Sequence, residues 1–188
     1  MCIRDSLGPD LPNSSAIAQL SARGWNQLRY ILFKQVTPDV VPAREPVHGV
    51  PMLFYGLSVE AMMKGDEARR INQVTWALSY IRDRCKERGI TLLVVLIPDK
   101  AQVYRDFLPR HVHSVDRPVP ASCLWTLEKD LEDEGIDVVN LLPSFRSAAE
   151  NQKVLYWGDD THWNAEGVRI AADLTSDKVK ELLHVQKE

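Results

Sequence analysis

Apolar residues recur at spacings of three and four over residues 67–88 and predict an amphipathic helix. The positions that share one face of this helix are Ile71, Val74, Leu78, Ile81 and Cys85. That spacing matches a period of 3.6 residues and indicates a single buried stripe. Gly89 follows, and glycine commonly ends a helix in the left-handed conformation.

An unbroken apolar run at residues 91–97 follows this helix and predicts a buried strand. Polar residues do not alternate with apolar ones in the run, which is typical of a strand covered on both faces in a parallel sheet. Pro98 ends the run, because proline has no N–H to donate to a neighbouring strand.

The same unit of helix, glycine and strand occurs a second time. Leu124, Leu127 and Leu131 share one face of a helix that we expect to begin near Pro120. A glycine closes this helix, and the next apolar run covers residues 137–142, where a proline again ends it. Strands that alternate with helices of this length indicate an α/β fold with a mainly parallel sheet.

The remaining segments predict shorter or less regular elements. Residues 154–157 predict a short strand, and residues 165–183 predict a last helix with Asn164 as its N-cap. Residues 22–34 predict a further helix. Residues 48–55, which follow three closely spaced prolines, predict an edge strand or the arm of a hairpin.

An Asp-x-His pair, Asp160 and His162, lies between the predicted strand at 154–157 and the last helix. In an extended segment the side chains of residues i and i+2 point the same way. Asp160 can therefore accept a hydrogen bond from one ring nitrogen of His162, leaving the other nitrogen to take a proton from a nucleophile. The pair predicts two of the three groups of a catalytic triad, at the end of a strand where such sites form.

Two other interpretations of this segment stay open. In the first, Asp160 caps a turn, His162 is an ordinary loop histidine and Trp163 packs in the core. In the second, Asp159, Asp160 and His162 bind a metal ion. Zinc and iron sites usually take further His or Cys ligands, and none stands at a useful spacing here.

Composition narrows the class of protein. The 188 residues suffice for one domain, and 45% apolar with 26% charged residues is ordinary for a globular protein. A net charge of -3, with acids and bases well mixed, argues against nucleic acid as a partner. The three cysteines share no metal-type spacing.

No run approaches the roughly 18 apolar residues of a membrane span, and no signal-peptide pattern opens the chain.

Three blocks of the sequence resemble the alginate O-acetyltransferase (AlgX/AlgJ) family, which has an SGNH hydrolase-like domain. Residues 157–167 resemble its D-T-H-W-x-x-x-G signature, and residues 97–104 resemble its P-x-K-x-x-x-Y segment. Residues 48–55 are similar to its G-x-x-G-W-L-F-Y strand, although Pro51 and Met52 replace the usual Gly-Trp. The resemblance spans approximately residues 45 to 185.

The resemblance implies an α/β fold of three layers, SGNH-like and flavodoxin-like, with a mainly parallel sheet and flanking helices. We expect an incomplete domain of this kind at residues 45–188, after an N-terminal segment at residues 1–44. Residues 1–6 share no structural pattern with the rest of the sequence, so we expect the natural N-terminus to lie elsewhere.

The resemblance also assigns the candidate triad. The aspartate and histidine of the family's triad correspond to Asp160 and His162. The nucleophilic serine of the family belongs to a later G-x-S block that this sequence lacks. Three of the serines within the matching region are the ones to weigh as nucleophiles, and each lies in a poor setting: Ser58, Ser144 and Ser176. We therefore expect a fragment that is inactive by itself.

The function implied is transfer of an acetyl group onto an exported polysaccharide, or its removal, in the periplasm or cell envelope. The implied partners are a polysaccharide acceptor, an acetyl donor and other envelope biosynthesis proteins, with no metal and no cofactor. Lys100, Tyr104 and Trp163 are candidates for substrate contact. The competing interpretation of Lys100 is a solvated loop residue. The competing interpretation of the two aromatic residues is packing in the core. The alternative function is a non-catalytic carbohydrate-binding or assembly module of the same fold.

Overall fold

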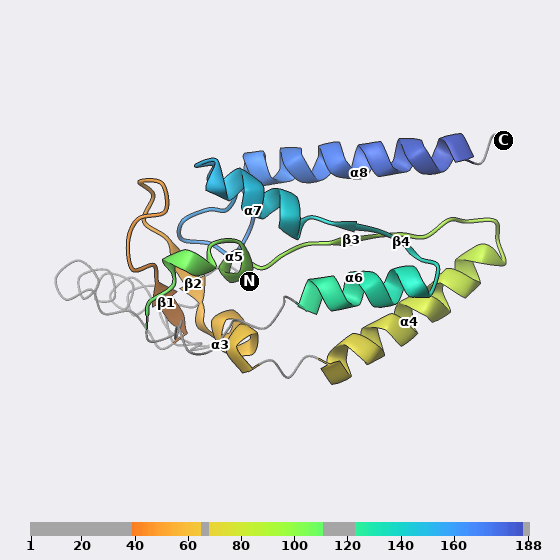
Figure 1. The fold of residues 1–188 in the computed structure, drawn as a ribbon, viewed down its shortest axis with the longest axis horizontal. Coiled ribbons are helices and arrows are strands. Elements are labelled where there is room, and N and C mark those ends of the chain that lie inside the picture. Colours follow the sequence, from red (N-terminus) through yellow and green to blue (C-terminus); the bar gives the residue numbers. More distant parts are fainter. Residues whose placement is uncertain (1–38, 65–67, 111–122, 186–188) are drawn as a thin grey trace, which may run out of the picture.

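Strands and helices alternate along the chain, as Figure 1 shows for the computed structural model. The structure describes residues 39–64, 68–110 and 123–185, and the predicted helix at 22–34 lies outside them. The elements are, in order, β1 (Val40–Pro42), β2 (Leu53–Tyr55), α3 (Gly56–Lys64), α4 (Ala68–Lys86), β3 (Leu93–Leu96), α5 (Lys100–Val103), the 3₁₀ turn η1 (Arg105–Phe107), α6 (Cys123–Asp133), β4 (Asp137–Asn140), α7 (Leu142–Glu150) and α8 (Ala165–Val185).

The two predicted strands at the centre of the chain pair with each other in parallel. Leu93 of β3 lies opposite Asp137 of β4, and Leu96 lies opposite Asn140. In Figure 1, α4 and α6 lie on one side of this pair and α7 and α8 on the other. Parallel strands joined by a helix and flanked by helices confirm the α/β class. β1 and β2 form a separate antiparallel pair.

The helices predicted within the described residues are present, but the burial predicted for α4 is only partly correct. Ile71 is buried, whereas Val74 and Ile81 are 41% and 44% exposed. Within the described ranges α4 packs mainly against α6, so only part of its apolar face is covered. Gly89 follows α4 with a φ of +67°, the left-handed conformation predicted for it.

The burial predicted for β3 is also only partly correct. Leu93, Val94 and Val95 are half-buried, and only Leu96 is fully buried. Within the described part of the chain β3 has a single neighbouring strand, β4, so its faces are less covered than those of a strand inside a wide sheet.

The strand predicted at 154–157 is wrong, because no neighbouring strand lies beside it in the described residues. Instead, the N–H of Leu155 donates to the Tyr104 hydroxyl (2.8 Å), and its carbonyl accepts from the N–H of Asn164 (2.8 Å). Only an isolated bridge between Tyr156 and Trp163 is strand-like. The segment is therefore held by side chains and by the start of α8.

Helix α7 was not predicted, because Pro143 after an apolar run indicates only that a strand ends. In the structure Pro143 lies in the first turn of α7. Proline is well suited to that position, where its missing N–H has no partner to lose. The Asn140 side chain accepts from the N–H of Leu142 (3.0 Å) at the same turn.

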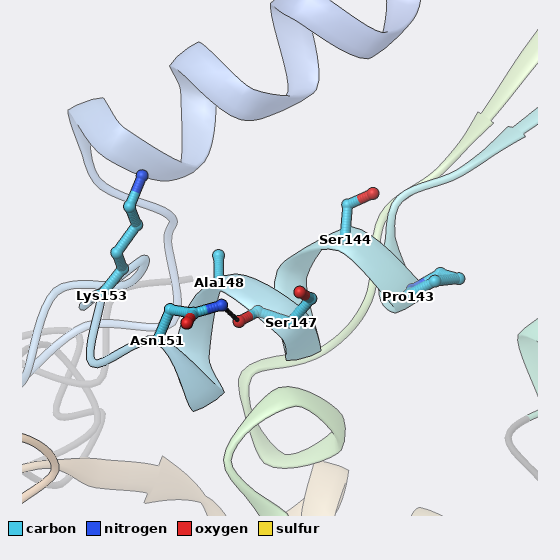
Figure 2. Close-up of a pocket in the computed structure, with 6 residues that line it drawn as sticks. All are labelled: Pro143, Ser144, Ser147, Ala148, Asn151 and Lys153. Atoms are coloured by element: carbon cyan, nitrogen blue, oxygen red, sulfur yellow. Dashed lines mark hydrogen bonds between the residues drawn. The ribbon is translucent and has the colours of Figure 1, made fainter.

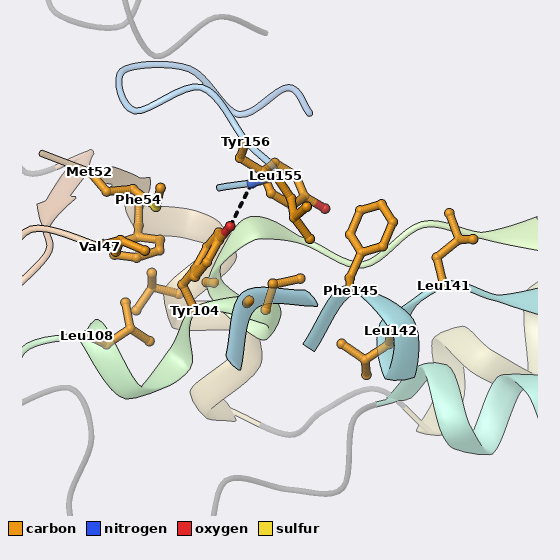
Figure 3. Packing of buried hydrophobic residues seen from close by; sticks show 14 of the residues in the cluster. Val47, Met52, Phe54, Tyr104, Leu108, Leu141, Leu142, Phe145, Leu155 and Tyr156 are labelled. Carbon is orange, nitrogen blue, oxygen red and sulfur yellow. Dashed lines mark hydrogen bonds between the residues drawn. The ribbon is translucent and has the colours of Figure 1, made fainter. Parts of the chain in front are cut away.

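The main hydrophobic core lies between the antiparallel pair and helices α5 and α7 (Figure 3). Its centre is a chain of aromatic rings in edge-on contact. Tyr104 and Tyr156 have centroids 6.3 Å apart, and Phe145 and Tyr156 are 6.1 Å apart. The half-buried Trp163 extends this chain, 6.3 Å from Phe145. The core therefore supports both ends of the segment that carries Asp160 and His162.

Gly167 in the first turn of α8 is expected to tolerate no side chain. A Cβ at this position would lie 2.6 Å from the Leu155 carbonyl oxygen and 3.1 Å from the Trp163 Cβ. Gly167→Ala should therefore lower the free energy of unfolding by about 2 kcal/mol, as overpacking does, and urea denaturation would measure it. The control is Ala172→Gly on the exposed face of α8. It should lose roughly 0.5–1 kcal/mol through helix propensity alone. A stabilising Gly167→Ala would contradict the expected clash.

Candidate functional site

Asp160 and His162 lie in the dyad loop, defined here as residues 157–162, which connects Tyr156 to Trp163. The N–H of Trp157 donates to the His162 carbonyl across the base of this loop (3.1 Å). After the loop, the Asn164 side chain accepts from the N–H groups of Glu166 (2.9 Å) and Gly167 (3.1 Å). Asn164 is thus the N-cap of α8, as predicted, and fixes one end of the loop.

The structure brings the two predicted residues into contact. The His162 Nδ1 lies 2.6 Å from the Asp160 Oδ1. Because an ionised carboxylate can only accept, Nδ1 is the donor, and Nε2 carries the lone pair of a neutral ring. The His162 side chain is 58% exposed and that of Asp160 21%. The ring is therefore oriented by the carboxylate while remaining open to solvent.

The contact arises from a turn and not from the extended segment that we predicted. The backbone N–H of His162 also donates to the Asp160 Oδ1 (3.0 Å), which makes residues 160–162 an Asx turn. One carboxylate oxygen thus holds both the main chain and the ring of His162. The spacing of two residues indicated the correct pair, although for a different geometric reason.

Lys100 is buried beneath the dyad loop and is only 2% exposed. Its ammonium donates to the carbonyls of Trp157 (2.6 Å), Gly158 (3.0 Å) and Asp160 (2.9 Å). Burial lowers the pKa of Lys100 to about 8, against the raising effects of Asp159, Asp160 and Asp99. The interpretation of Lys100 as a solvated loop residue is wrong, and the ammonium faces the loop instead of a solvent-filled cleft.

Tyr104 is also buried and braces the segment just before the loop. Its hydroxyl donates to the Lys153 carbonyl (3.2 Å) and accepts from the N–H of Leu155 (2.8 Å). Burial raises the pKa of Tyr104 to about 12, although the Leu155 N–H lowers it. Its position fits the packing interpretation, and contact with substrate stays a prediction for Lys100, Tyr104 and Trp163.

Sequence reasoning missed Gly158, where the three blocks of the family resemblance meet. The Gly158 carbonyl accepts from the Lys100 ammonium and from the N–H of Leu53 (2.8 Å). A Cβ on Gly158 would lie 2.4 Å from the Pro51 carbonyl oxygen, so only glycine allows this approach. The available signal was the glycine directly before the two aspartates.

Tyr156 was likewise missed as a polar contact, because it lies in a run that predicts a strand. Its hydroxyl donates to the Pro98 carbonyl (2.5 Å), which ties the base of the loop to the end of β3. Burial, together with Asp99 and Tyr104, raises the pKa of Tyr156, so the hydroxyl stays protonated and keeps this bond.

A separate open depression lies along α7 (Figure 2). It is lined by Pro143, Ser144, Ser147, Ala148, Asn151 and Lys153. Asn151 donates to the Ser147 carbonyl (2.8 Å) within it, and neither Asp160 nor His162 belongs to its lining. Across the described ranges, no serine is hydrogen-bonded to His162.

Two other features are absent from the described residues. His, Cys, Asp and Glu side chains form no group of three there that could hold a metal ion. None of the helices described combines the length and the apolar character needed to cross a membrane.

The chain matches a family model over residues 53–188, described as "SGNH hydrolase-like domain, acetyltransferase AlgX". The protein therefore belongs to this family of SGNH hydrolase-like acetyltransferase domains, and the predicted resemblance is confirmed.

Its relatives include proteins of alginate biosynthesis. It is 28% identical over 170 residues to the probable alginate O-acetylase AlgJ of Pseudomonas aeruginosa, covering 88% of this chain and 39% of that protein. It is 28% identical over 109 residues to the alginate biosynthesis protein AlgX of Pseudomonas putida, covering 56% of this chain and 23% of that protein. The chain thus spans well under half the length of either relative.

A solved structure agrees with the fold. The O-acetyltransferase domain of Pseudomonas putida AlgJ superposes with a TM-score of 0.54 at 21% identity. The match covers 78% of this chain and 49% of that chain. At this level of identity the similarity supports the α/β fold and nothing more specific.

Proposed function

We propose that His162 is the general base, and Asp160 the carboxylate that orients it, in an acyl-transfer site that moves acetyl groups on a polysaccharide. The observation that carries the proposal is the 2.6 Å hydrogen bond between Asp160 and a solvent-exposed His162 in a member of this acetyltransferase family. A histidine held in one tautomer by a carboxylate is the general base of a hydroxyl nucleophile.

In the proposed reaction, the His162 Nε2 removes the proton of a serine hydroxyl as its oxygen bonds to the acetyl carbonyl carbon. The imidazolium, stabilised by Asp160, then protonates the departing oxygen of the donor as the bond from carbon to that oxygen breaks. An acceptor hydroxyl reverses these steps to take the acetyl group, and water in its place gives hydrolysis. The serine would come from outside the residues that the structure describes. The step requires no metal and no nucleotide cofactor.

The proposal extends to the setting of the site. We infer that β3 and β4 belong to a larger, mainly parallel sheet in a three-layer SGNH-like domain over residues 45–188. The names of the relatives support alginate, or a similar polysaccharide, as acceptor. We further propose that this polysaccharide is exported and that the site works in the periplasm or cell envelope. Other envelope biosynthesis proteins are proposed as partners on the same basis.

The proposal is tested by measuring acetyl release and transfer by the gene product that carries Asp160 and His162. Acetyl release from a chromogenic acetate ester should exceed the uncatalysed rate, and acetylated oligosaccharide should be detected by mass spectrometry when acceptor is added. A gene product that binds the oligosaccharide without releasing acetyl from any ester would contradict the proposal and favour the non-catalytic module.

A further inference from the structure

We propose that Lys100 is a positioning residue, which fixes the dyad loop by binding three of its main-chain carbonyls and so holds Asp160 in place for His162. The consequence for acyl transfer rests on the proposed function. The positioning role of Lys100 can be measured without any enzymatic turnover. The positioning role and the acyl-transfer function can therefore be contradicted separately.

The number of donors matches the number of acceptors. An ammonium has three N–H donors and no acceptor, and the carbonyls of Trp157, Gly158 and Asp160 take one each. With Lys100 only 2% exposed, water is a poor substitute for any of the three. Loss of the ammonium would remove one donor from each of the three carbonyls at a buried place, and of these the Gly158 carbonyl would keep the N–H of Leu53. The loop would then rearrange to replace the lost hydrogen bonds.

Lys100 is itself held rigidly at the end of β3. The Asp99 side chain accepts from the N–H of Ala101 (2.8 Å). Asp99 and Gln102 also form a capping box, in which the Asp99 side chain accepts from the N–H of Gln102 and the Gln102 side chain accepts from the N–H of Asp99 (2.8 Å). The Pro98 carbonyl accepts from the Tyr156 hydroxyl (2.5 Å). The ammonium is thus anchored to the sheet, and the loop is anchored to the ammonium.

The positioning effect of Lys100 reaches His162 through a single residue, Asp160. Lys100 holds the carbonyl of Asp160, and the carboxylate of the same residue holds both the main chain and the ring of His162. A shift in the Asp160 main chain would therefore move the acceptor that selects the His162 tautomer.

The charges around the ammonium favour its protonated form. The negative charges of Asp159, Asp160 and Asp99 raise its pKa, and the centre of the Phe54 ring lies 5.8 Å away, near enough for a cation–π contact. Burial opposes them and leaves the pKa at about 8, so the ammonium, with all three donors, is the main form at pH 7.

The first experiment uses the unaltered chain. NMR of protein labelled with ¹⁵N and ¹³C at pH 6 should show couplings across hydrogen bonds from the Lys100 Nζ to the carbonyl carbons of Trp157, Gly158 and Asp160. Absence of all three couplings would overturn the proposal without any variant having to fold.

The second experiment compares Lys100→Met with Lys153→Met. Lys153 is a matched control, because its ammonium binds the exposed Glu166 (2.8 Å) and makes no bond to the dyad loop. The ¹⁵N spectrum of His162 should show one tautomer, protonated at Nδ1, in the unaltered chain and in Lys153→Met. In Lys100→Met the two ring nitrogens should move toward the averaged shifts of exchanging tautomers. An unchanged His162 spectrum in a folded Lys100→Met would overturn the proposal.

Lys100→Gln serves if the methionine variant does not fold, because a glutamine amide keeps two of the three donors. It should give a His162 spectrum between the two extremes, and a spectrum identical to that of the unaltered chain would count against positioning.

Kinetics then separate this inference from the proposed function. In the active gene product, Lys100→Met should lower kcat for ester hydrolysis by about 10–100-fold with little change in KM, as small misplacement of a catalytic group does. An altered His162 spectrum in a gene product that never turns over ester would sustain the positioning role and remove the acyl-transfer function. Full turnover by Lys100→Met would remove the positioning role alone.

Discussion

His162→Ala is expected to lower kcat/KM for acetyl release by about three orders of magnitude or more, in the gene product that carries this site. The variant removes the group that is placed to take the proton of a hydroxyl nucleophile, whereas substrate binding by the rest of the site remains. A chromogenic acetate ester and an acetylated oligosaccharide would report the loss independently. Because the His162 side chain is 58% exposed and its ring bonds only Asp160 in the described residues, the melting temperature should change little.

The role of the carboxylate is tested by a neighbouring pair of variants. Asp160→Asn should lower kcat by about 10³–10⁴-fold, because an amide in this position can stabilise the wrong tautomer of His162 and cannot stabilise its imidazolium. Asp159→Asn is the matched control, since Asp159 is the adjacent, exposed carboxylate and makes no hydrogen bond to His162. Equal losses in the two variants would mean that the local negative charge matters and the oriented hydrogen bond does not.

Much of the fold could be predicted because its signals are local. Helices α4, α6 and α8 and strands β3 and β4 follow from the period of the apolar residues and from glycine or proline at their ends. The contact between Asp160 and His162 is local as well, since it joins residues two apart. Even there, the sequence indicated the pair and not the Asx turn that forms it.

The support of the site could not be predicted, because its contacts join distant parts of the chain. Lys100 and Trp157 are 57 positions apart, and Gly158 meets Leu53 of β2 and Pro51, which lies just before that strand. A lysine after a strand is most often solvated, and no pattern indicates that three carbonyls will converge on it. The family resemblance marked the three blocks without indicating that they meet at one glycine.

The arrangement suggests a division of roles between the blocks. In the proposed function the dyad loop carries the chemistry, while hydrogen bonds from Lys100 and Leu53 hold its main chain. No residue of the loop belongs to the hydrophobic core of the described residues, so the loop geometry depends on these hydrogen bonds and on the aromatic core at its base. Rigid support of this kind is what a site needs when a small displacement of the base reduces the rate.

Phe145→Ala is expected to cost about 3–5 kcal/mol of unfolding free energy, the usual range for a large aromatic residue lost from a core. Phe145 is fully buried on α7, and its ring lies against that of Tyr156, which precedes the dyad loop (Figure 3). Its ring also lies against that of Trp163, which follows the loop. Urea denaturation would measure the loss. Trp76→Ala is the control: Trp76 is larger but 74% exposed on α4, so its removal should change stability by less than about 0.5 kcal/mol. Since the cavity opens beneath the loop, the His162 ¹⁵N spectrum should also broaden in Phe145→Ala and stay sharp in Trp76→Ala. Similar costs for the two variants would show that the aromatic chain is not the centre of the core.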